Sequence, residues 1–541
     1  MFLPVTKEEM QKLGWKQCDI ILVTGDAYID SAYMGVAVIG NYLSAHGYKV
    51  GVIAQPDYQS DADITALGEP AIYWGVTGGS VDSMVSNFTA SLKRRKMDDF
   101  TPGGVNNKRP DNASIVYCNL IRKYFKQTKP IVLGGIEASL RRIAHYDYVK
   151  DNIKRSILFD AKADYIVYGM GEKTSLKLAE AIKNGENPAE LRGLCYISTA
   201  IPDGYLTIPS FEEAKADKEK FLEMFMSFHK NGQLANPKGL VQKQDTRYLV
   251  QNPPQVYDTY DLDEIYGLSY ERDAHPIYKN KGVIRALETI RFSITTHRGC
   301  FGNCSFCAIS LLQGTKIIDR SEESILNEAR EIAALPDFKG YITDLGGPTA
   351  NMYGMNENGE FKISHKRQTA LLRKIREIKG IKKVFVASGI RYDLIFRDRE
   401  FGMEYLEEVT AHHVSGQLKV APEHSDERIL KLMNKPGSRD LIKFKAEFEK
   451  AGSKNGLNQH LTYYFIAAYP GCGETEMKRV ASFVKDVLGT KAEQVQIFTP
   501  TPSTMATAMY YTEKNPETGE KLFVEKNIGA KEWQKRLLTG G

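Results

Sequence analysis

With 541 residues, the chain is longer than one ordinary domain, and two or three domains are expected. Hydrophobic residues make up 42% and charged residues 26%, which excludes a disordered or fibrous protein. The net charge of +5 is small for this length and favours no class of partner. The first seventeen residues lack the apolar core of a signal peptide, and no apolar run reaches the roughly 20 residues of a membrane span. A cytoplasmic protein without a membrane segment is therefore expected.

From residue 19 to about residue 183, short apolar runs alternate with amphipathic ones, a pattern typical of βα units on a parallel sheet. The expected helices include residues 35–45 and 173–182. The expected strands are residues 19–24, 50–54, 71–76, 130–133 and 165–168. We therefore expect a doubly wound α/β domain over residues 1–200.

The next stretch has a different composition. Residues 201–285 contain the sequence Asn252-Pro253-Pro254 and a tyrosine-rich, acidic run from Tyr257 to Tyr270. Proline and asparagine clusters interrupt regular elements, so we expect an extended connector here.

A stronger alternation begins near residue 290. The expected strands are residues 291–295, 340–344, 384–388, 417–421, 462–467 and 494–498, and the expected helices are residues 322–334, 367–378, 404–412, 438–451 and 474–488. This pattern predicts a partial (β/α)6 barrel over residues 286–511, with its binding groups at the carboxyl ends of the strands. Residues 512–541 are expected to form a C-terminal tail.

Basic residues gather in two places in the N-terminal half. They are residues 93–96 and, farther along, Arg141, Arg142, Lys150, Lys154 and Arg155. Such patches could contact an RNA backbone. The alternative is a set of solvated helix faces, because charges commonly line exposed helices.

An odd count of seven cysteines, in a chain without a secretion signal, argues against a disulfide framework. Cys300, Cys304 and Cys307 have the spacing CxxxCxxC and directly follow the first expected barrel strand. A four-iron cluster normally takes four thiolates, so three cysteines would leave one iron open to another ligand. Zinc is the alternative, but it would require a fourth ligand, and the spacing of His297 does not match a zinc-knuckle pattern.

The same spacing, with the aromatic Phe306 before the last cysteine, resembles the defining motif of the radical S-adenosylmethionine (SAM) superfamily. The resemblance implies a 4Fe-4S cluster that cleaves SAM to methionine and a 5′-deoxyadenosyl radical. Gly346 and Gly347 match a glycine motif that binds the methionine moiety, although Pro348 replaces its glutamate. The alternative at these glycines is a tight turn.

Other strand ends carry further candidates by the same resemblance. Ser388, Arg391 and Glu423 follow the third and fourth expected strands, where similar barrels bind the ribose or the carboxylate of SAM. Surface-loop residues are the alternative. Cys472 lies in a loop that resembles one in radical SAM methylthiotransferases, and it is a candidate catalytic thiol that quenches a radical or holds an intermediate. The alternative is a buried, inert cysteine.

Most of the chain resembles the YgiQ family of radical SAM proteins. The matching segments are residues 23–28, 103–105, 133–142, 419–424 and 498–502. The N-terminal domain also resembles cobalamin-binding domains, but residues 30–35 lack the histidine that would ligate cobalt from below. Binding of cobalamin without a protein ligand stays open.

Neither the motifs nor the family fixes the substrate. We expect modification of a macromolecule, an RNA or a protein, with a flavodoxin or a ferredoxin as electron donor. A small metabolite is a second candidate substrate. A non-catalytic iron–sulfur protein that transfers electrons or senses redox state is the alternative function.

Overall fold

The computed structural model describes residues 1–357 and 360–540. The chain forms two compact units, each of which draws on more than one segment. The first unit contains Met1–Val256, Leu268–Arg291 and Thr501–Ser503, and the second contains Tyr257–Gly267, Phe292–Pro500 and the residues from Thr504 onward. Among the described residues, none of the helices is both long and apolar enough to span a bilayer.

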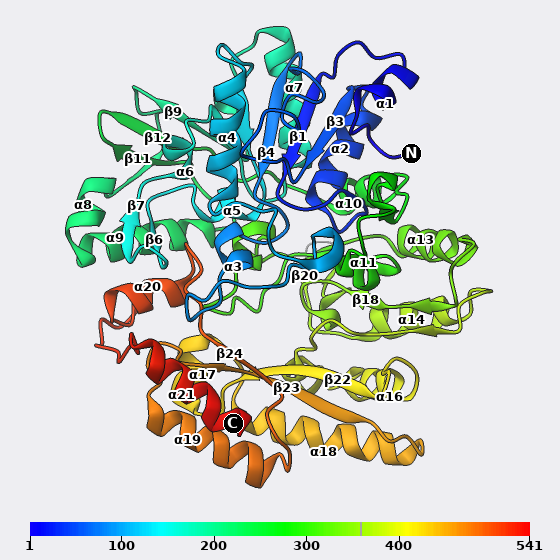
Figure 1. Cartoon of the computed structure of the whole chain (residues 1–541). Coiled ribbons are helices and arrows are strands. Elements are labelled where there is room, and N and C mark those ends of the chain that lie inside the picture. The colour runs from blue at the N-terminus through cyan, green and yellow to red at the C-terminus, as the bar shows by residue number, and fades with distance from the viewer. Residues whose placement is uncertain (358–359, 541) are drawn as a thin grey trace. The chain divides into compact units, whose positions relative to one another are not determined.

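The first unit is built on a nine-stranded mixed sheet with the order β10-β11-β12-β9-β8-β5-β4-β1-β3 (Figure 1). Its parallel part confirms the five predicted strands: β1 (Ile20–Thr24), β3 (Val50–Ala54), β4 (Tyr73–Thr77), β5 (Ile131–Leu133) and β8 (Tyr165–Val167). The crossover from β1 to β3 and the crossover from β4 to β5 run in opposite directions across the sheet. Because such crossovers are right-handed, their helices α2 (Gly35–Ala45) and α4 (Ala113–Tyr124) cover opposite faces.

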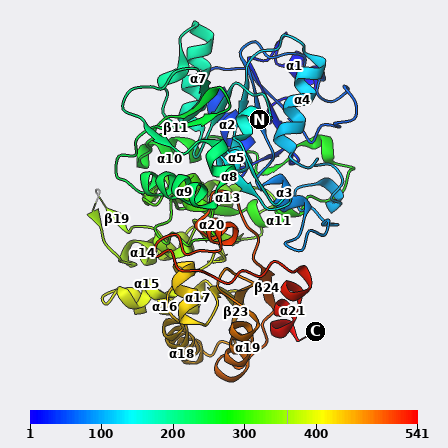
Figure 2. The ribbon, with the colours of Figure 1, turned by 90° about the vertical axis from the view of Figure 1, so that its left-hand side faces the viewer.

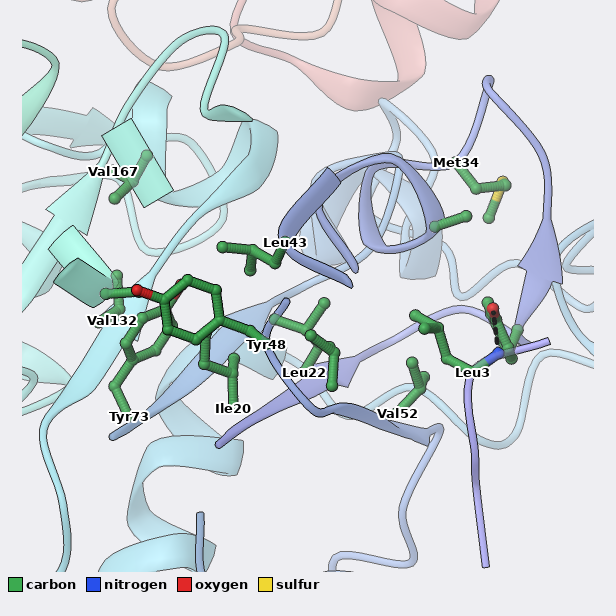
Figure 3. Close-up of a cluster of buried hydrophobic side chains, with 14 of the residues drawn as sticks. Leu3, Ile20, Leu22, Met34, Leu43, Tyr48, Val52, Tyr73, Val132 and Val167 are labelled. Atoms are coloured by element: carbon green, nitrogen blue, oxygen red, sulfur yellow. Dashed lines mark hydrogen bonds between the residues drawn. The ribbon is translucent and has the colours of Figure 1, made fainter. Parts of the chain in front are cut away.

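The core of this unit explains its continuous apolar strands. Every residue of β1 is buried, as expected for a parallel strand that is covered on both faces. Figure 3 shows Leu43 of α2 near Ile20 and Leu22 of β1, with Val52 of β3 and Val132 of β5 in the same cluster. Packing of this kind fixes the positions of the loops that follow the strands.

The prediction of an extended connector at residues 201–285 was wrong for much of that segment. Strands β10 (Leu206–Ile208), β11 (Leu240–Gln244) and β12 (Arg247–Gln251) join the sheet through β9 (Leu194–Ser198). Helices α8 (Phe211–Ala216) and α9 (Lys218–Gly232) lie between these strands in the sequence.

Buried glutamines concealed the strands in this segment. Gln242, Gln244 and Gln251 are buried, and their side-chain oxygens accept hydrogen bonds from Ala144 N, Ser156 N and the Arg142 guanidinium. The three glutamines interrupt the apolar pattern that predicts a strand. The other predicted domain boundaries stay a prediction.

The second unit contains the six predicted barrel strands. They are β14 (Ser293–Thr295), β17 with β18 (Tyr341–Ile342 and Asp344–Gly346), β21 (Lys383–Val384), β22 (Gln417–Glu423), β23 (His460–Ala467) and β24 (Gln494–Ile497). The first three pair in parallel in chain order, and so do the last three. The helices that follow the first five strands include α13 (Glu322–Ala334), α14 (Lys366–Arg376), α16 (Gly402–His412), α18 (Ser438–Lys454) and α19 (Glu474–Ser482). Figure 2 shows α18 and α19 side by side next to β23.

The predicted C-terminal tail is folded into this second unit. Helix α21 (Ile528–Thr539) packs against α19, β23 and β24. Its Gln534 is buried and accepts a hydrogen bond of 3.0 Å from the backbone N–H of Ala468, which directly follows β23. The last helix therefore covers one strand end of the barrel.

Candidate active site

The cysteine loop follows the first barrel strand, as predicted, and is held by a second segment of the unit. Ser305 N donates to Met433 O at 3.1 Å, and the amide of Asn434 donates to Gly302 O at 3.2 Å. Both partners lie at the end of α17 (Glu427–Met433), which comes after the fourth strand. The loop is therefore fixed from outside its own sequence.

The three cysteines of the loop are partly exposed and influence one another electrostatically. Burial is the largest cause that raises the pKa of the Cys307 thiol to about 11, and the neighbouring Cys304 and Cys300 contribute to the same rise. Burial also raises the pKa of Cys304, while the cations Lys435 and Arg391 lower it. No three His, Cys, Asp or Glu side chains of residues 1–357 and 360–540 converge on a single-ion site. The site therefore combines three neighbouring thiols with two cations that favour thiolates.

Arg391 is the better fixed of the two cations. Its Nε donates to Asp393 Oδ1 at 2.8 Å and its Nη2 donates to Asp393 Oδ2 at 3.1 Å, a bidentate fork. The remaining nitrogen, Nη1, is buried and has no hydrogen-bond partner among the described residues. A Cβ at Gly302 would lie 2.7 Å from Nη1 and 3.3 Å from Cys300 Sγ. The glycine thus leaves room for the guanidinium against the cysteine loop.

The predicted glycine pair lies at the end of β18. A Cβ on Gly347 would approach Cε1 of the buried His297 ring to 2.5 Å, and a Cβ on Gly346 would lie 3.3 Å from Ser388 Cβ. Close packing of His297 therefore accounts for Gly347 without any cofactor. Burial lowers the pKa of His297 to about 3, which keeps the ring neutral.

Ser388, which follows β21, is hydrogen-bonded to Asp344 in the neighbouring strand segment β18. Its hydroxyl donates to an Asp344 carboxylate oxygen, and the backbone N–H groups of Ala387 and Ser388 donate to Asp344 Oδ1 at 2.8 and 3.0 Å. The hydroxyl proton is therefore engaged, and the oxygen is left to accept.

Glu423 ends β22 in a left-handed conformation, with φ of 69°. This conformation costs a non-glycine residue conformational free energy, and such strain is common at functional sites. Burial raises the pKa of Glu423, and Lys435 partly opposes this. Glu423 also contributes to the raised pKa of Cys304, after burial and Cys300.

Phe306 packs against a buried tyrosine at the fifth strand end. Its ring meets that of Tyr469 edge-on, with centroids 6.4 Å apart. The hydroxyl groups of Tyr469 and Ser305 lie 2.7 Å apart, within hydrogen-bonding distance. Phe306 thus helps to join the cysteine loop to the loop after β23.

The predicted catalytic residue Cys472 is buried against His424 and Gln534. The residue is fully buried, with Sγ 3.4 Å from Nε2 of His424 and 3.9 Å from Oε1 of Gln534 on α21. Burial raises the pKa of the thiol well above its usual value. These contacts hold a neutral thiol beneath the C-terminal helix, and its predicted catalytic role stays a prediction.

Sequence reasoning missed several residues of this site. Thr349 Oγ1 lies 3.5 Å from Cys300 Sγ, and Lys435 acts on both Cys304 and Cys307. Asn351 bonds both backbone groups of Arg391. Thr349 and Asn351 are within five residues of the predicted glycine pair, which was the available signal.

The strand ends of the first unit carry a buried charge network. Arg109 Nη2 lies 2.5 Å from Asp26 Oδ1, and its Nη1 lies 3.1 Å from Asp98 Oδ2. The other oxygen of Asp26 accepts a hydrogen bond of 2.6 Å from Ser80 N. These groups follow β1 and β4, the adjacent strands at which the sheet order reverses.

Part of the predicted basic patch is also buried. Arg142 donates to Gln251 at 2.8 Å, and its guanidinium lies 4.7 Å from the ring centroids of both Tyr168 and Phe228. Arg141 forms an ion pair with Asp82 and is likewise buried. Neither the possible RNA contact nor the alternative of a solvated helix face holds for these two arginines, because their charges are used inside the fold.

Comparison with family models and known proteins defines the class. A model described as Radical SAM N-terminal matches residues 2–293, one described as the Radical SAM superfamily matches residues 294–484, and a domain of unknown function, DUF3362, matches residues 493–538. With the barrel and the sheet described above, these matches define a radical SAM enzyme.

Relatives then give the particular family. A UPF0313 protein of Fusobacterium nucleatum is 51% identical over 559 residues, which cover 99% of this chain and 98% of the relative. A UPF0313 protein of Thermotoga maritima is 46% identical and covers 98% of this chain and 96% of the relative. The chain belongs to the UPF0313 family, which corresponds to the YgiQ family that the motifs resemble.

Solved structures of low sequence identity share the fold. The radical SAM methyltransferase TsrM from Kitasatospora setae, with tryptophan and a SAM analogue bound, aligns with a TM-score of 0.51 and 16% identity, covering 90% of this chain and 75% of TsrM. The cobalamin-dependent SAM radical enzyme OxsB, with aqua-cobalamin bound, aligns with a TM-score of 0.54 and 13% identity, covering 95% of this chain and 58% of OxsB.

Proposed function

We propose that Cys300, Cys304 and Cys307 hold a 4Fe-4S cluster with one iron left open for SAM. The observation that carries this proposal is the presence of three partly exposed thiols on one loop after the first barrel strand, with Arg391 Nη1 against Gly302 of the same loop. Thiolates are the usual ligands of such clusters, and nearby cations favour the thiolate form. When bound and reduced, the cluster supplies the electron that cleaves SAM into methionine and a 5′-deoxyadenosyl radical.

The residues around the loop would bind and orient SAM. Arg391 offers the unpartnered Nη1 as a donor for a carboxylate. Glu423 offers an acceptor beside the loop, and Ser388 offers an acceptor oxygen because its proton is engaged by Asp344. Gly346 and Gly347 would admit the methionine moiety, with His297 as an independent reason for the second glycine.

Phe306 and Cys472 have different proposed roles. Phe306 would pack beside SAM and fix the loop through Tyr469. Cys472 would act on a radical or an intermediate only if the contacts with His424 and Gln534 opened, because the thiol is fully buried as described.

The substrate is proposed to be a macromolecule, an RNA or a protein, and the electron donor a flavodoxin or a ferredoxin. The buried Arg141 and Arg142 provide no support for RNA, whereas residues 93–96 are exposed and keep that candidate open. A non-catalytic iron–sulfur carrier is the competing function, and it would not require Arg391 to keep a nitrogen unpartnered.

The N-terminal sheet does not fit cobalamin in its strand-end crevice. In doubly wound folds, ligands bind at the point where the strand order reverses, here after β1 and β4. A Cβ on Gly25 would lie only 2.2 Å from Gly78 O, so the two loops meet backbone to backbone. Asp26 and the fully buried Arg109 fill the adjoining space.

Iron and sulfide content after anaerobic reconstitution tests the cluster. Changing Cys300, Cys304 or Cys307 to Ala should each abolish the broad visible absorbance and most of the bound iron. The matched control is Cys118→Ala, which alters a fully buried thiol in α4 and should keep both. Full wild-type iron and sulfide content in any of the three single variants of Cys300, Cys304 or Cys307 would overturn the assignment.

A further inference from the structure

We propose that Asn351, oriented by His365 and Asp398, positions Arg391 against the cysteine loop and thereby sets the affinity for SAM. This inference rests on the proposed function, because it assigns Arg391 to SAM. It adds three buried residues that neither the motifs nor the resemblance identified. Asn351 and His365 are completely buried, and Asp398 is nearly so.

Asn351 clamps the backbone of Arg391 from one side chain. Arg391 N donates to Asn351 Oδ1 at 2.8 Å, and Asn351 Nδ2 donates to Arg391 O at 3.0 Å. Both backbone groups of one residue are thereby satisfied by one amide. Alongside, Ala350 N donates to Gly389 O at 3.0 Å, so the loops after the second and third strands are tied together.

The orientation of that amide is set by His365. Because a carboxylate only accepts, His365 Nδ1 must donate to Asp398 Oδ2, 2.8 Å away. The neutral ring then presents a lone pair at Nε2, which accepts from Asn351 Nδ2 at 3.1 Å. A flipped amide would place Oδ1 against two acceptors, His365 Nε2 and Arg391 O. Only one assignment satisfies every group.

The surroundings of His365 favour this neutral tautomer. Burial lowers the pKa of His365, and the hydrogen bond to Asp398 only partly opposes this. The ring is stacked on Tyr405, with centroids 4.7 Å apart. Asp398 is itself held by the backbone N–H groups of His365 and Phe401, at 2.6 and 3.0 Å. Each link from Asp398 through His365 to Asn351 is therefore a hydrogen bond between buried groups.

The contacts of Asn351 matter because the Arg391 guanidinium must fit between Asp393 and the cysteine loop. Asp393 holds two of its nitrogens, and the third faces the space that Gly302 leaves open beside Cys300. Without Asn351, the Arg391 N–H loses its partner and the Arg391 carbonyl keeps only the Leu394 N–H, at 3.2 Å, so the backbone that carries the guanidinium is held less firmly. Asn351 is accordingly a positioning residue, since it acts on SAM through Arg391.

A double-mutant cycle on the reconstituted protein tests the inference. SAM affinity is measured by anaerobic calorimetry for wild type, Asn351→Ala, Arg391→Ala and the double variant. Asn351→Ala should weaken SAM binding about tenfold while cluster content stays normal. In the Arg391→Ala background, the same change should have no further effect, because the two residues act as one unit.

The control and the contrary results are specific. Asn252→Ala removes another fully buried amide, which donates to Ala189 O and Leu191 O in the first unit. This control should lose stability without losing SAM affinity. If Asn351→Ala does not fold, Asn351→Asp replaces it, since Asp keeps the acceptor for Arg391 N and removes both donors. Additive losses in the cycle, or unchanged affinity, would refute the positioning role. Failure of wild type itself to bind SAM would instead refute the proposed function.

Discussion

Replacing Arg109 by Met should strongly destabilise the first unit. The side chain of Arg109 is 0% exposed, and those of Asp26 and Asp98 are 2% and 4% exposed. Removing the shared cation leaves two carboxylates buried without it, and breaking a buried ion pair in this way costs about 3–5 kcal/mol. The matched control is Arg94→Met, whose side chain is 50% exposed and pairs with Asp111, which is 40% exposed. That change should cost no more than about 1 kcal/mol.

The pH dependence of the Arg109→Met effect has a definite sign. Burial raises the pKa of Asp26 in the folded protein, while Arg109 and the Ser80 N–H oppose the rise. A carboxyl group whose folded pKa is raised stabilises the fold below its unfolded pKa, and this contribution is lost as the pH rises through the folded pKa. Without Arg109 the folded pKa rises further. The variant should therefore be most impaired at neutral pH and approach wild type as the pH falls.

Urea denaturation followed by tryptophan fluorescence measures this difference, because the fully buried Trp74 lies in β4, in the same unit as the network. Transitions are recorded at neutral pH and at about pH 5 for wild type and both variants. A loss below about 1 kcal/mol at neutral pH, or a loss that grows toward acid pH, would refute the reasoning.

Three further predictions concern single positions. Gly25→Ala should lower the Tm because the new Cβ would lie 2.2 Å from Gly78 O. The control Gly35→Ala should leave the Tm unchanged, because a Cβ there meets nothing within 4 Å. Equal Tm values for the two variants would mean that the crevice after β1 and β4 is open. Cys472→Ser should assemble a normal cluster and still cleave SAM with dithionite, because the thiol is bonded to His424 and Gln534; loss of the cluster would make Cys472 a ligand. Gly347→Ala should weaken SAM binding even in a His297→Ala background, in which the nearest ring is absent; restored affinity there would show that the glycine serves only His297.

The fold could be predicted wherever it depends on local pattern. Apolar runs and amphipathic helices predicted the parallel strands of both units, and β1 is the clearest case because it is buried along its whole length. The same approach failed at β11 and β12, where Gln242 and Gln251 are buried because of partners about a hundred residues away. Local pattern contains no information on such distant partners.

In the candidate site, too, contiguous motifs could be predicted and distant contacts could not. The cysteine spacing and the glycine pair are contiguous motifs, so the sequence marks where the loops lie. Arg391 was predicted as a candidate, but its supports are not contiguous with it: Asn351 is 40 residues away, and His365 is 14 residues beyond Asn351. The burial of Arg141 and Arg142 could not be predicted, because burial is a property of the folded chain rather than of the residue type.

The electron paramagnetic resonance spectrum of the reconstituted, reduced protein, recorded before and after addition of SAM, tests the central claim most directly. An open iron beside Cys300, Cys304 and Cys307 predicts that SAM changes the cluster signal, because SAM ligates the cluster directly. An unchanged signal with saturating SAM would contradict the account and favour a closed iron–sulfur carrier.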